Sequence, residues 1–125
     1  MNKITKVTAR QIFDSRGNPT IEAEVFSNNI SAKSICPSGA STGTYEAFEK
    51  RDFKNKKYLG KSVIRPVFLI NTIIAKKLKN KNIHNQELID SILINLDGTK
   101  QKKNLGANSI LAVSMAVKKL SSKIK

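Results

Sequence analysis

The sequence predicts an α+β fold in which a three-stranded antiparallel meander is followed by a helical bundle. Two patterns support this prediction. Between residues 3 and 36, short runs with apolar residues at every second position alternate with turn formers, as in half-buried strands. After residue 62 the apolar residues recur about every 3.6 positions, as on one side of a helix. A chain of 125 residues can bury a core of its own, so we expect residues 1–125 to form one domain.

The first strand is predicted over residues 3–13, a segment rich in β-branched residues. In an extended chain, one side of this strand would carry Thr5, Val7, Ala9, Gln11 and Phe13. The turn formers "DSRGNP" follow, and Gly17 can adopt the positive φ that such a turn requires.

The next two strands are separated by the short turn "SNN". In "TIEAEVF" the residues alternate, so Ile21, Ala23 and Val25 are expected to face one way and Thr20, Glu22 and Glu24 the other. The third strand, "ISAKSIC", ends before Pro37. Tight turns between the strands predict an antiparallel meander with one buried face.

The first predicted helix has an apolar stripe made of Val63, Val67, Ile70 and Ile74, with Ile64 and Phe68 beside it. We expect Pro66 to lie in the first turn of this helix, because deeper in the helix it would remove a backbone hydrogen bond and clash with the preceding turn.

Two further helices complete the predicted bundle. For the first of them, Asn85 is a plausible N-cap and Gly98 a stop signal. Its apolar face would consist of Leu88, Ile89, Ile92, Leu93 and Leu96. The last helix should begin near Gly106 and run through Ile110, Val113, Val117 and Leu120 into a lysine-rich tail.

The formal net charge of +14 would attract polyanions. However, the lysines are spread along the chain and come close to clustering only at residues 54–57 and 76–82, where no aromatic residues are interleaved with them to stack on bases. We therefore interpret the charge as a solvated surface and expect no nucleic-acid partner. A stand-alone basic module that binds RNA or acidic partners is the alternative.

Cys36 is the only cysteine, which excludes an internal disulfide and a zinc site built from cysteines. The N-terminal residues lack the apolar core of a signal peptide, and no apolar run is long enough to cross a bilayer. These features predict a cytoplasmic protein with no membrane partner.

The residues that could carry chemistry are few. His84 is the only histidine, and its polar surroundings in the sequence predict a surface location. The nine carboxylates have no spacing typical of a metal site or of a catalytic pair. No nucleophile has an obvious base partner nearby in the sequence.

The loop "CPSGASTGTYEAFEKRD" at 36–52 is the remaining candidate. Gly39 and Gly43 free the backbone, and the hydroxyls of Ser41 and Thr42 are oxygen donors of the kind used in phosphate or Mg²⁺ sites. Yet "GASTG" lacks the lysine and the spacing of a P-loop. The pattern alone therefore favours a flexible polar connection over an anion or metal site.

Several segments, in the same order, resemble the enolase family, the glycolytic phosphopyruvate hydratases. They are "DSRGNPT" at 14–20, "PSGASTG" at 37–43, "EAFEKRD" at 46–52, "YLGKSV" at 58–63, "LDGT" at 96–99 and "LGANSILAVSMA" at 105–116. The resemblance implies an N-terminal α+β domain, which in the family caps a barrel of about 250 residues. We expect this chain to be the capping domain without the barrel.

The family's reaction, as the resemblance implies it, interconverts 2-phosphoglycerate and phosphoenolpyruvate with a Lys base, a Glu acid and two Mg²⁺. The base, the acid and the carboxylates of the first metal site belong to the barrel. The resemblance therefore places no catalytic residue in this chain, which we expect to be inactive without a barrel supplied in cis or in trans.

The resemblance also implies roles for residues of this chain. Ser41 would bind the second Mg²⁺ through its hydroxyl and carbonyl oxygens. The loop that would close over the substrate contains Gly39, Ala40, Thr42 and Gly43. Enolases are commonly homodimers in which the positions of Arg10 and Glu22 pair with the partner's barrel; without a barrel, both would be exposed strand residues. Departures from the family pattern are Phe53, Ser62 and Pro66.

Overall fold

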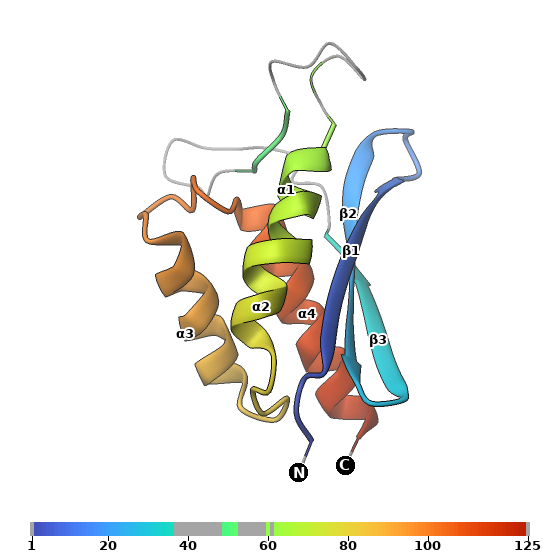
Figure 1. The fold of residues 1–125 in the computed structure, drawn as a ribbon. Helices are drawn as coiled ribbons and strands as arrows, with labels where there is room; N and C mark the ends of the chain where they lie inside the picture. Colours follow the sequence, from blue (N-terminus) through green and yellow to red (C-terminus); the bar gives the residue numbers. More distant parts are fainter. Residues whose placement is uncertain (1, 37–48, 53–59, 61, 125) are drawn as a thin grey trace.

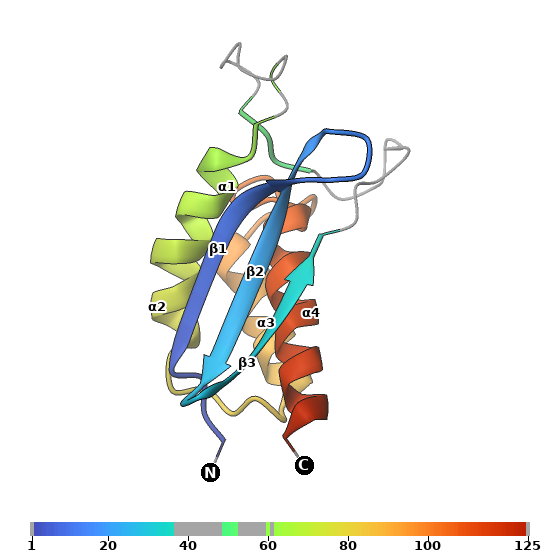
Figure 2. The ribbon, with the colours of Figure 1, turned by 90° about the vertical axis from the view of Figure 1, so that its right-hand side faces the viewer.

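The computed structural model describes residues 2–36, 49–52, 60 and 62–124. A three-stranded antiparallel sheet in the order β1-β2-β3 has helices packed on one face, as predicted (Figure 1). The strands are β1 (Lys6–Phe13), β2 (Pro19–Ser27) and β3 (Ile30–Ile35). In Figure 2 the sheet faces the viewer, with the helices behind it.

The central strand β2 has the predicted alternation. Ile21, Ala23 and Val25 are fully buried because they point toward the helices. On β1, Val7 is buried, whereas Phe13, which was expected on the same side of the strand, has an exposed fraction of 50%. Phe13 pairs with Pro19 at the last position of the β1–β2 ladder, next to the turn, where it is not buried in the core.

The segment before β1 differs from the prediction, because the strand begins at Lys6 and not at residue 3. Ile4 instead pairs with the segment between the helices: its N–H donates to Lys81 O at 2.9 Å, and its carbonyl accepts from Asn80 N–H at 2.8 Å. The Ile4 side chain is fully buried. This pairing fastens the N-terminal residues against the body of the fold.

The first predicted helix consists of α1 (Ile64–Leu69), a π-helical turn η2 (Ile70–Ile74) and α2 (Ala75–Leu78). Within η2, the Asn71 amide accepts from Ala9 N–H at 2.8 Å and donates to Ala9 O at 3.1 Å. Asn71 therefore satisfies main-chain groups on the outer edge of β1, as a neighbouring strand would.

The two apolar residues expected beside the stripe of this helix are exposed. Ile64 and Phe68 are 55% and 51% exposed, whereas Ile70 and Ile74 are fully buried. The Phe68 ring instead lies 5.3 Å from the Arg65 guanidinium, which is a cation–π contact.

The helices α3 (Gln86–Asp97) and α4 (Ala107–Lys123) have the predicted boundaries. The Asn85 side chain accepts from Leu88 N–H at 3.2 Å, and Gly98 ends α3 with a φ of 74°. Leu88, in the first turn of α3, was expected on the apolar face, but it is 41% exposed.

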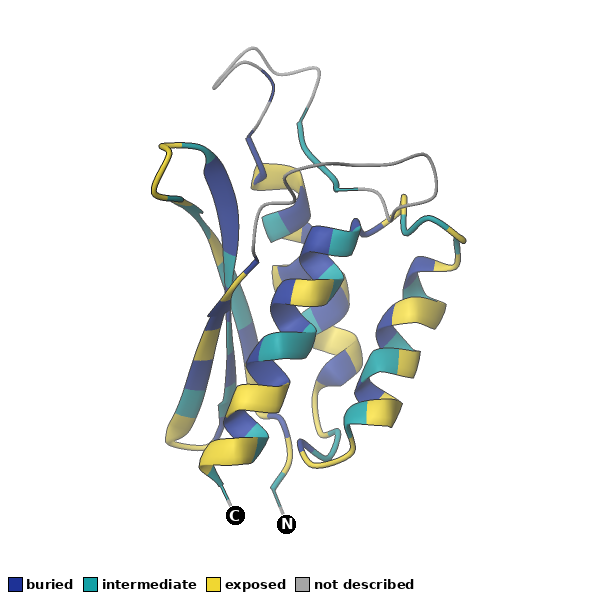
Figure 3. Ribbon diagram, turned by 180° about the vertical axis from the view of Figure 1, so that it is seen from behind, coloured by how far each residue is buried: buried dark blue, intermediate teal, exposed yellow. Residues whose placement is uncertain are grey.

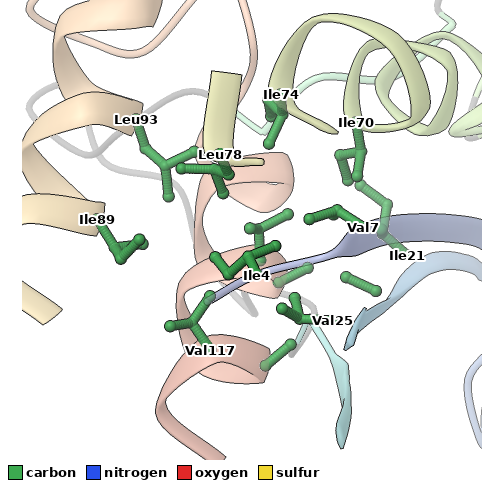
Figure 4. Packing of buried hydrophobic residues seen from close by; sticks show 14 of the residues in the cluster. Ile4, Val7, Ile21, Val25, Ile70, Ile74, Leu78, Ile89, Leu93 and Val117 are labelled. Atoms are coloured by element: carbon green, nitrogen blue, oxygen red, sulfur yellow. The ribbon is translucent and has the colours of Figure 1, made fainter. Parts of the chain in front are cut away.

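The core lies between the sheet and the helices. Figure 4 shows residues of the sheet converging with residues of η2, α2, α3 and α4. In Figure 3, buried and exposed residues alternate along the helices, and exposed residues also lie on the strands and turns. Helix α4 packs on β2 and β3, while α3 packs on α4 and α2. No helix in the described part of the chain has the length and hydropathy required to span a bilayer.

Candidate functional site

The predicted lid residues Gly39, Ala40, Thr42 and Gly43 and the predicted metal ligand Ser41 lie outside the described residues. The structure does describe both ends of the segment that contains them. We call Cys36 and residues 49–52 the loop anchor. Four sets of contacts hold the loop anchor against the sheet, α1 and α4.

The N-terminal side of the anchor is held by β2. Cys36 N–H donates to Ile21 O at 2.9 Å, and Cys36 O accepts from the Thr20 hydroxyl at 2.9 Å. Both Thr20 and Cys36 are buried. Burial, and to a smaller extent the Glu49 carboxylate, raise the pKa of the Cys36 thiol from 9.0 to about 12, while Arg51 opposes the shift.

The C-terminal side is held by Arg51. Its Nη1 donates to Pro19 O at 2.8 Å, and its Nη2 pairs with Glu49 Oε1. The side chains of Arg51 and Glu49 are only 13% and 21% exposed, so the pair is largely shielded from water. Pro19 and Thr20 are consecutive on β2, which means that one end of β2 holds both ends of the segment.

Lys50 is held by α4 through Asn108. Its N–H donates to Asn108 Oδ1 at 3.0 Å, and its carbonyl accepts from Asn108 Nδ2 at 2.9 Å. The residue that precedes α4, Gly106, has a φ of +90°, and a Cβ there would lie 2.5 Å from Lys50 Cβ. Only glycine permits this close approach of the anchor to the start of α4.

Asp97 fixes the connection that carries Gly106. Its side chain is buried, with Oδ1 accepting from Leu105 N–H at 2.7 Å and Oδ2 accepting from Thr99 N–H at 3.0 Å and from the Thr99 hydroxyl. Burial raises the pKa of Asp97, but the hydrogen bonds from Thr99 and Leu105 outweigh it and hold the pKa below 3.8. The carboxylate is therefore a structural acceptor.

Asp52 joins the anchor to α1. Its carboxylate accepts from Ile64 N–H at 2.9 Å and Arg65 N–H at 3.1 Å. These are the first two N–H groups of the helix, and the third residue is Pro66, which has no N–H. Pro66 thus fits the first turn, as predicted, and all of that turn's donors are satisfied.

Gln11 of β1 supports the same helix start. Its Oε1 accepts from Val63 N–H at 2.9 Å and from the Ser62 hydroxyl at 3.0 Å. Ser62, which departs from the family pattern, is buried and part of this contact.

The anchor carboxylates have structural partners, Glu49 in Arg51 and Asp52 in the first N–H groups of α1. Among the described residues, no three His, Cys, Asp or Glu side chains group in a way that could hold a metal ion. His84 is exposed, as predicted, and its Nδ1 lies 2.7 Å from the Ser121 hydroxyl. The arrangement can position a segment, but its described part holds no reactive pair.

The two residues predicted at a dimer contact lie opposite each other on β1 and β2. Arg10 Nε lies 2.7 Å from Glu22 Oε1, and the two side chains are 66% and 13% exposed. The interpretation of both as exposed strand residues was thus correct for Arg10 and wrong for Glu22, which the pairing shields. The contact with a partner subunit stays a prediction.

Sequence reasoning missed the roles of Gln11, Arg51, Asp52, Asp97 and Asn108. All but Gln11 lie in the segments quoted for the family resemblance. Their place in those segments was the one signal that could have indicated a role for them. Their functions depend on contacts between residues far apart in the sequence, such as Lys50 with Asn108, which periodicity does not reveal.

Comparisons with known proteins identify the family. Residues 4–125 match the family model described as "Enolase, N-terminal domain". The chain is 74% identical over 125 residues to an enolase of Pelagibacter ubique, covering 100% of this chain and 30% of that protein. It is 57% identical over 117 residues to an enolase of Methanococcus maripaludis, covering 93% and 27% of the two chains. This chain thus spans less than a third of the length of these relatives, and over that length it belongs to the enolase family, as an N-terminal domain.

Proposed function

We propose that residues 1–125 are one domain of a glycolytic enolase, which interconverts 2-phosphoglycerate and phosphoenolpyruvate plus water in the cytoplasm. The domain would act with a barrel supplied in cis or in trans, within a homodimer. By itself we expect it to be inactive, because the described residues offer no general base beside a site for substrate. The observation that carries the proposal is the loop anchor.

The anchor supports a role for the segment 37–48 as a lid. The centre of a lid must move, whereas its two ends must keep a fixed position relative to the site. Here Thr20 and Arg51 hold the two ends on β2, and Asn108 and Asp52 tie the C-terminal end to α4 and α1. We propose that Gly39, Ala40, Thr42 and Gly43 form this lid.

Within the lid, we propose that Ser41 contributes its hydroxyl and carbonyl oxygens to the second Mg²⁺. Hard oxygen donors suit Mg²⁺, which usually keeps several ligands from substrate or water. Because Glu49 and Asp52 are engaged in the anchor, Ser41 would be this domain's contribution to the metal. When bound, Mg²⁺ would stabilise the negative charge that develops on the substrate carboxylate.

Ser41→Ala in an active assembly tests this role. We would join this chain to the part of the Pelagibacter enolase that follows the matched region, and measure phosphoenolpyruvate formation while varying Mg²⁺. Loss of one metal ligand should lower kcat/KM at least about tenfold and raise the Mg²⁺ concentration needed for half-maximal activity.

The matched control is Ser91→Ala, which removes the same hydroxyl from an exposed position on α3. It should leave both quantities unchanged. An active chimera in which Ser41→Ala behaves like Ser91→Ala would refute the metal role. A chimera that folds but forms no product would argue against the proposed enzyme function itself.

A further inference from the structure

A groove of about 570 Å³ lies between β3 and the C-terminal half of α4. Figure 2 shows β3 and α4 running side by side at one border of the fold, and the two elements are in contact. The volume is within the range of about 300–1,000 Å³ found for small-ligand pockets. The groove is lined by Ala32, Lys33, Met115, Lys118, Lys119, Ser122 and Lys123.

The groove follows the open edge of the sheet. Cys36 directs its N–H toward β2, so by alternation Ser31, Lys33 and Ile35 direct their main-chain groups away from β2. Consistent with this, Ser31 O accepts from Lys123 Nζ at 2.6 Å. In the described part of the chain, the main-chain groups of Lys33 and Ile35 have no hydrogen-bond partner. On the opposite edge, by contrast, Asn71 covers Ala9.

The groove is also strongly basic. None of its lining residues is acidic, and the amines of Lys33, Lys118 and Lys119 have no carboxylate partner among the described residues. The floor is apolar, because Met115 and the methylene stems of the lysines line it. An occupant should therefore combine carboxylates, an apolar side chain and main-chain hydrogen-bonding groups.

We propose that this groove binds an extended acidic polypeptide segment. The segment would pair with the open edge of β3 at Lys33 and Ile35, as in recognition by strand addition. Its carboxylates would contact Lys118 and Lys119, and an apolar side chain would rest on Met115. This inference does not depend on enolase activity.

A peptide fits the groove better than a nucleic acid does. No lining residue is aromatic, so bases would have no stacking platform. The strand edge offers main-chain donors and acceptors in the spacing of another strand, which a phosphodiester chain does not match.

The test measures binding of a short fluorescent peptide in which glutamate alternates with valine, by anisotropy at physiological ionic strength. The Lys118→Glu/Lys119→Glu variant should weaken binding at least about tenfold. The matched control, Lys76→Glu/Lys77→Glu, changes the net charge equally but lies on α2, beside β1 at the other border of the sheet in Figure 2. At a Debye length of about 8 Å, the control should change the affinity less than about twofold.

Two further arms keep the result interpretable. Lys118→Gln/Lys119→Gln should also weaken binding, and because it adds no negative charge it shows that the effect of the Glu variant does not come from a perturbed helix. A peptide with N-methyl groups at alternate amides should bind at least about tenfold more weakly, because it cannot pair with β3. Equal effects of the two Lys→Glu variants, no effect of N-methylation, or tighter binding of oligouridylate than of the peptide would each overturn the proposal.

Discussion

Asn108 and Lys50, which are 58 residues apart in the sequence, exchange two hydrogen bonds. The Asn108 side chain acts toward Lys50 as a neighbouring strand would, accepting from its N–H and donating to its carbonyl. Asn108 is buried, so this exchange takes place largely out of water.

Removal of this contact should destabilise the fold. Asn108→Ala leaves the N–H and carbonyl of Lys50 without partners, which should lower the free energy of unfolding by about 2–4 kcal/mol. Urea denaturation measures this change. Asn95→Ala, at an exposed position of α3, is the control and should stay within about 0.5 kcal/mol of the parent chain. Equal stabilities of the two variants would contradict the role given to Asn108.

Gly106 should tolerate no side chain. In Gly106→Ala the new Cβ would lie 2.5 Å from Lys50 Cβ, and the alanine would also have to adopt the φ of +90° found at this position. We compare it with Gly17→Ala, where φ is +80° but no heavy atom lies within 4 Å of the new Cβ. Gly17→Ala should cost about 1–2 kcal/mol from the backbone alone. Gly106→Ala should cost at least about 2 kcal/mol more, and similar costs for both would show that Lys50 does not approach Gly106 closely.

Asp97 should contribute to the acid sensitivity of the fold. Its folded pKa lies below 3.8, so its stabilising contribution is present above the unfolded pKa and is lost as the pH falls through the folded pKa. Asp97→Asn should lower stability at pH 7 by about 2–4 kcal/mol, because an amide NH₂ would face donors. Between pH 5 and pH 3, the variant should also lose less stability than the parent. Parallel stability curves for the two proteins would exclude this role.

The Cys36 thiol should be unreactive in the folded chain. With a pKa of about 12 in place of 9.0, its thiolate fraction at pH 8 is lower by a factor of about 1,000. Reaction with a disulfide reagent should therefore be at least that much slower than in urea. Because the unfolded thiol ionises first, stability should also decline as the pH rises above about 9. Thr20→Val, which removes the hydroxyl bonded to Cys36 O, should accelerate labelling, whereas Thr72→Val, at an exposed position of η2, should not.

Local patterns were sufficient to predict the main elements. The strict alternation of Ile21, Ala23 and Val25 predicted β2 and its buried face, and Asn85 and Gly98 predicted the ends of α3. These features depend on residues close in the sequence, where period and capping act directly.

The parts that could not be predicted depend on long-range contacts. Ile64 and Phe68 resemble core residues because an apolar stripe does not itself define which side of the helix meets the sheet. The π-helical turn could not be predicted either, since Asn71 contacts Ala9, a residue 62 positions away. The loop anchor is of the same kind, because its contacts with β2, α1 and α4 join residues that are far apart in the sequence.

The most direct test of the central proposal is the turnover rate of the chimera carrying Asn108→Ala. If the anchor fixes the ends of the lid segment relative to the active site, this variant should lower kcat at least about tenfold under conditions in which it remains folded. Leu93→Ala, a buried substitution on α3 that costs about 2–5 kcal/mol, controls for lost stability and should leave kcat within about twofold of the parent chimera. An active parent whose kcat is unchanged by Asn108→Ala, or lowered equally by Leu93→Ala, would contradict the proposal.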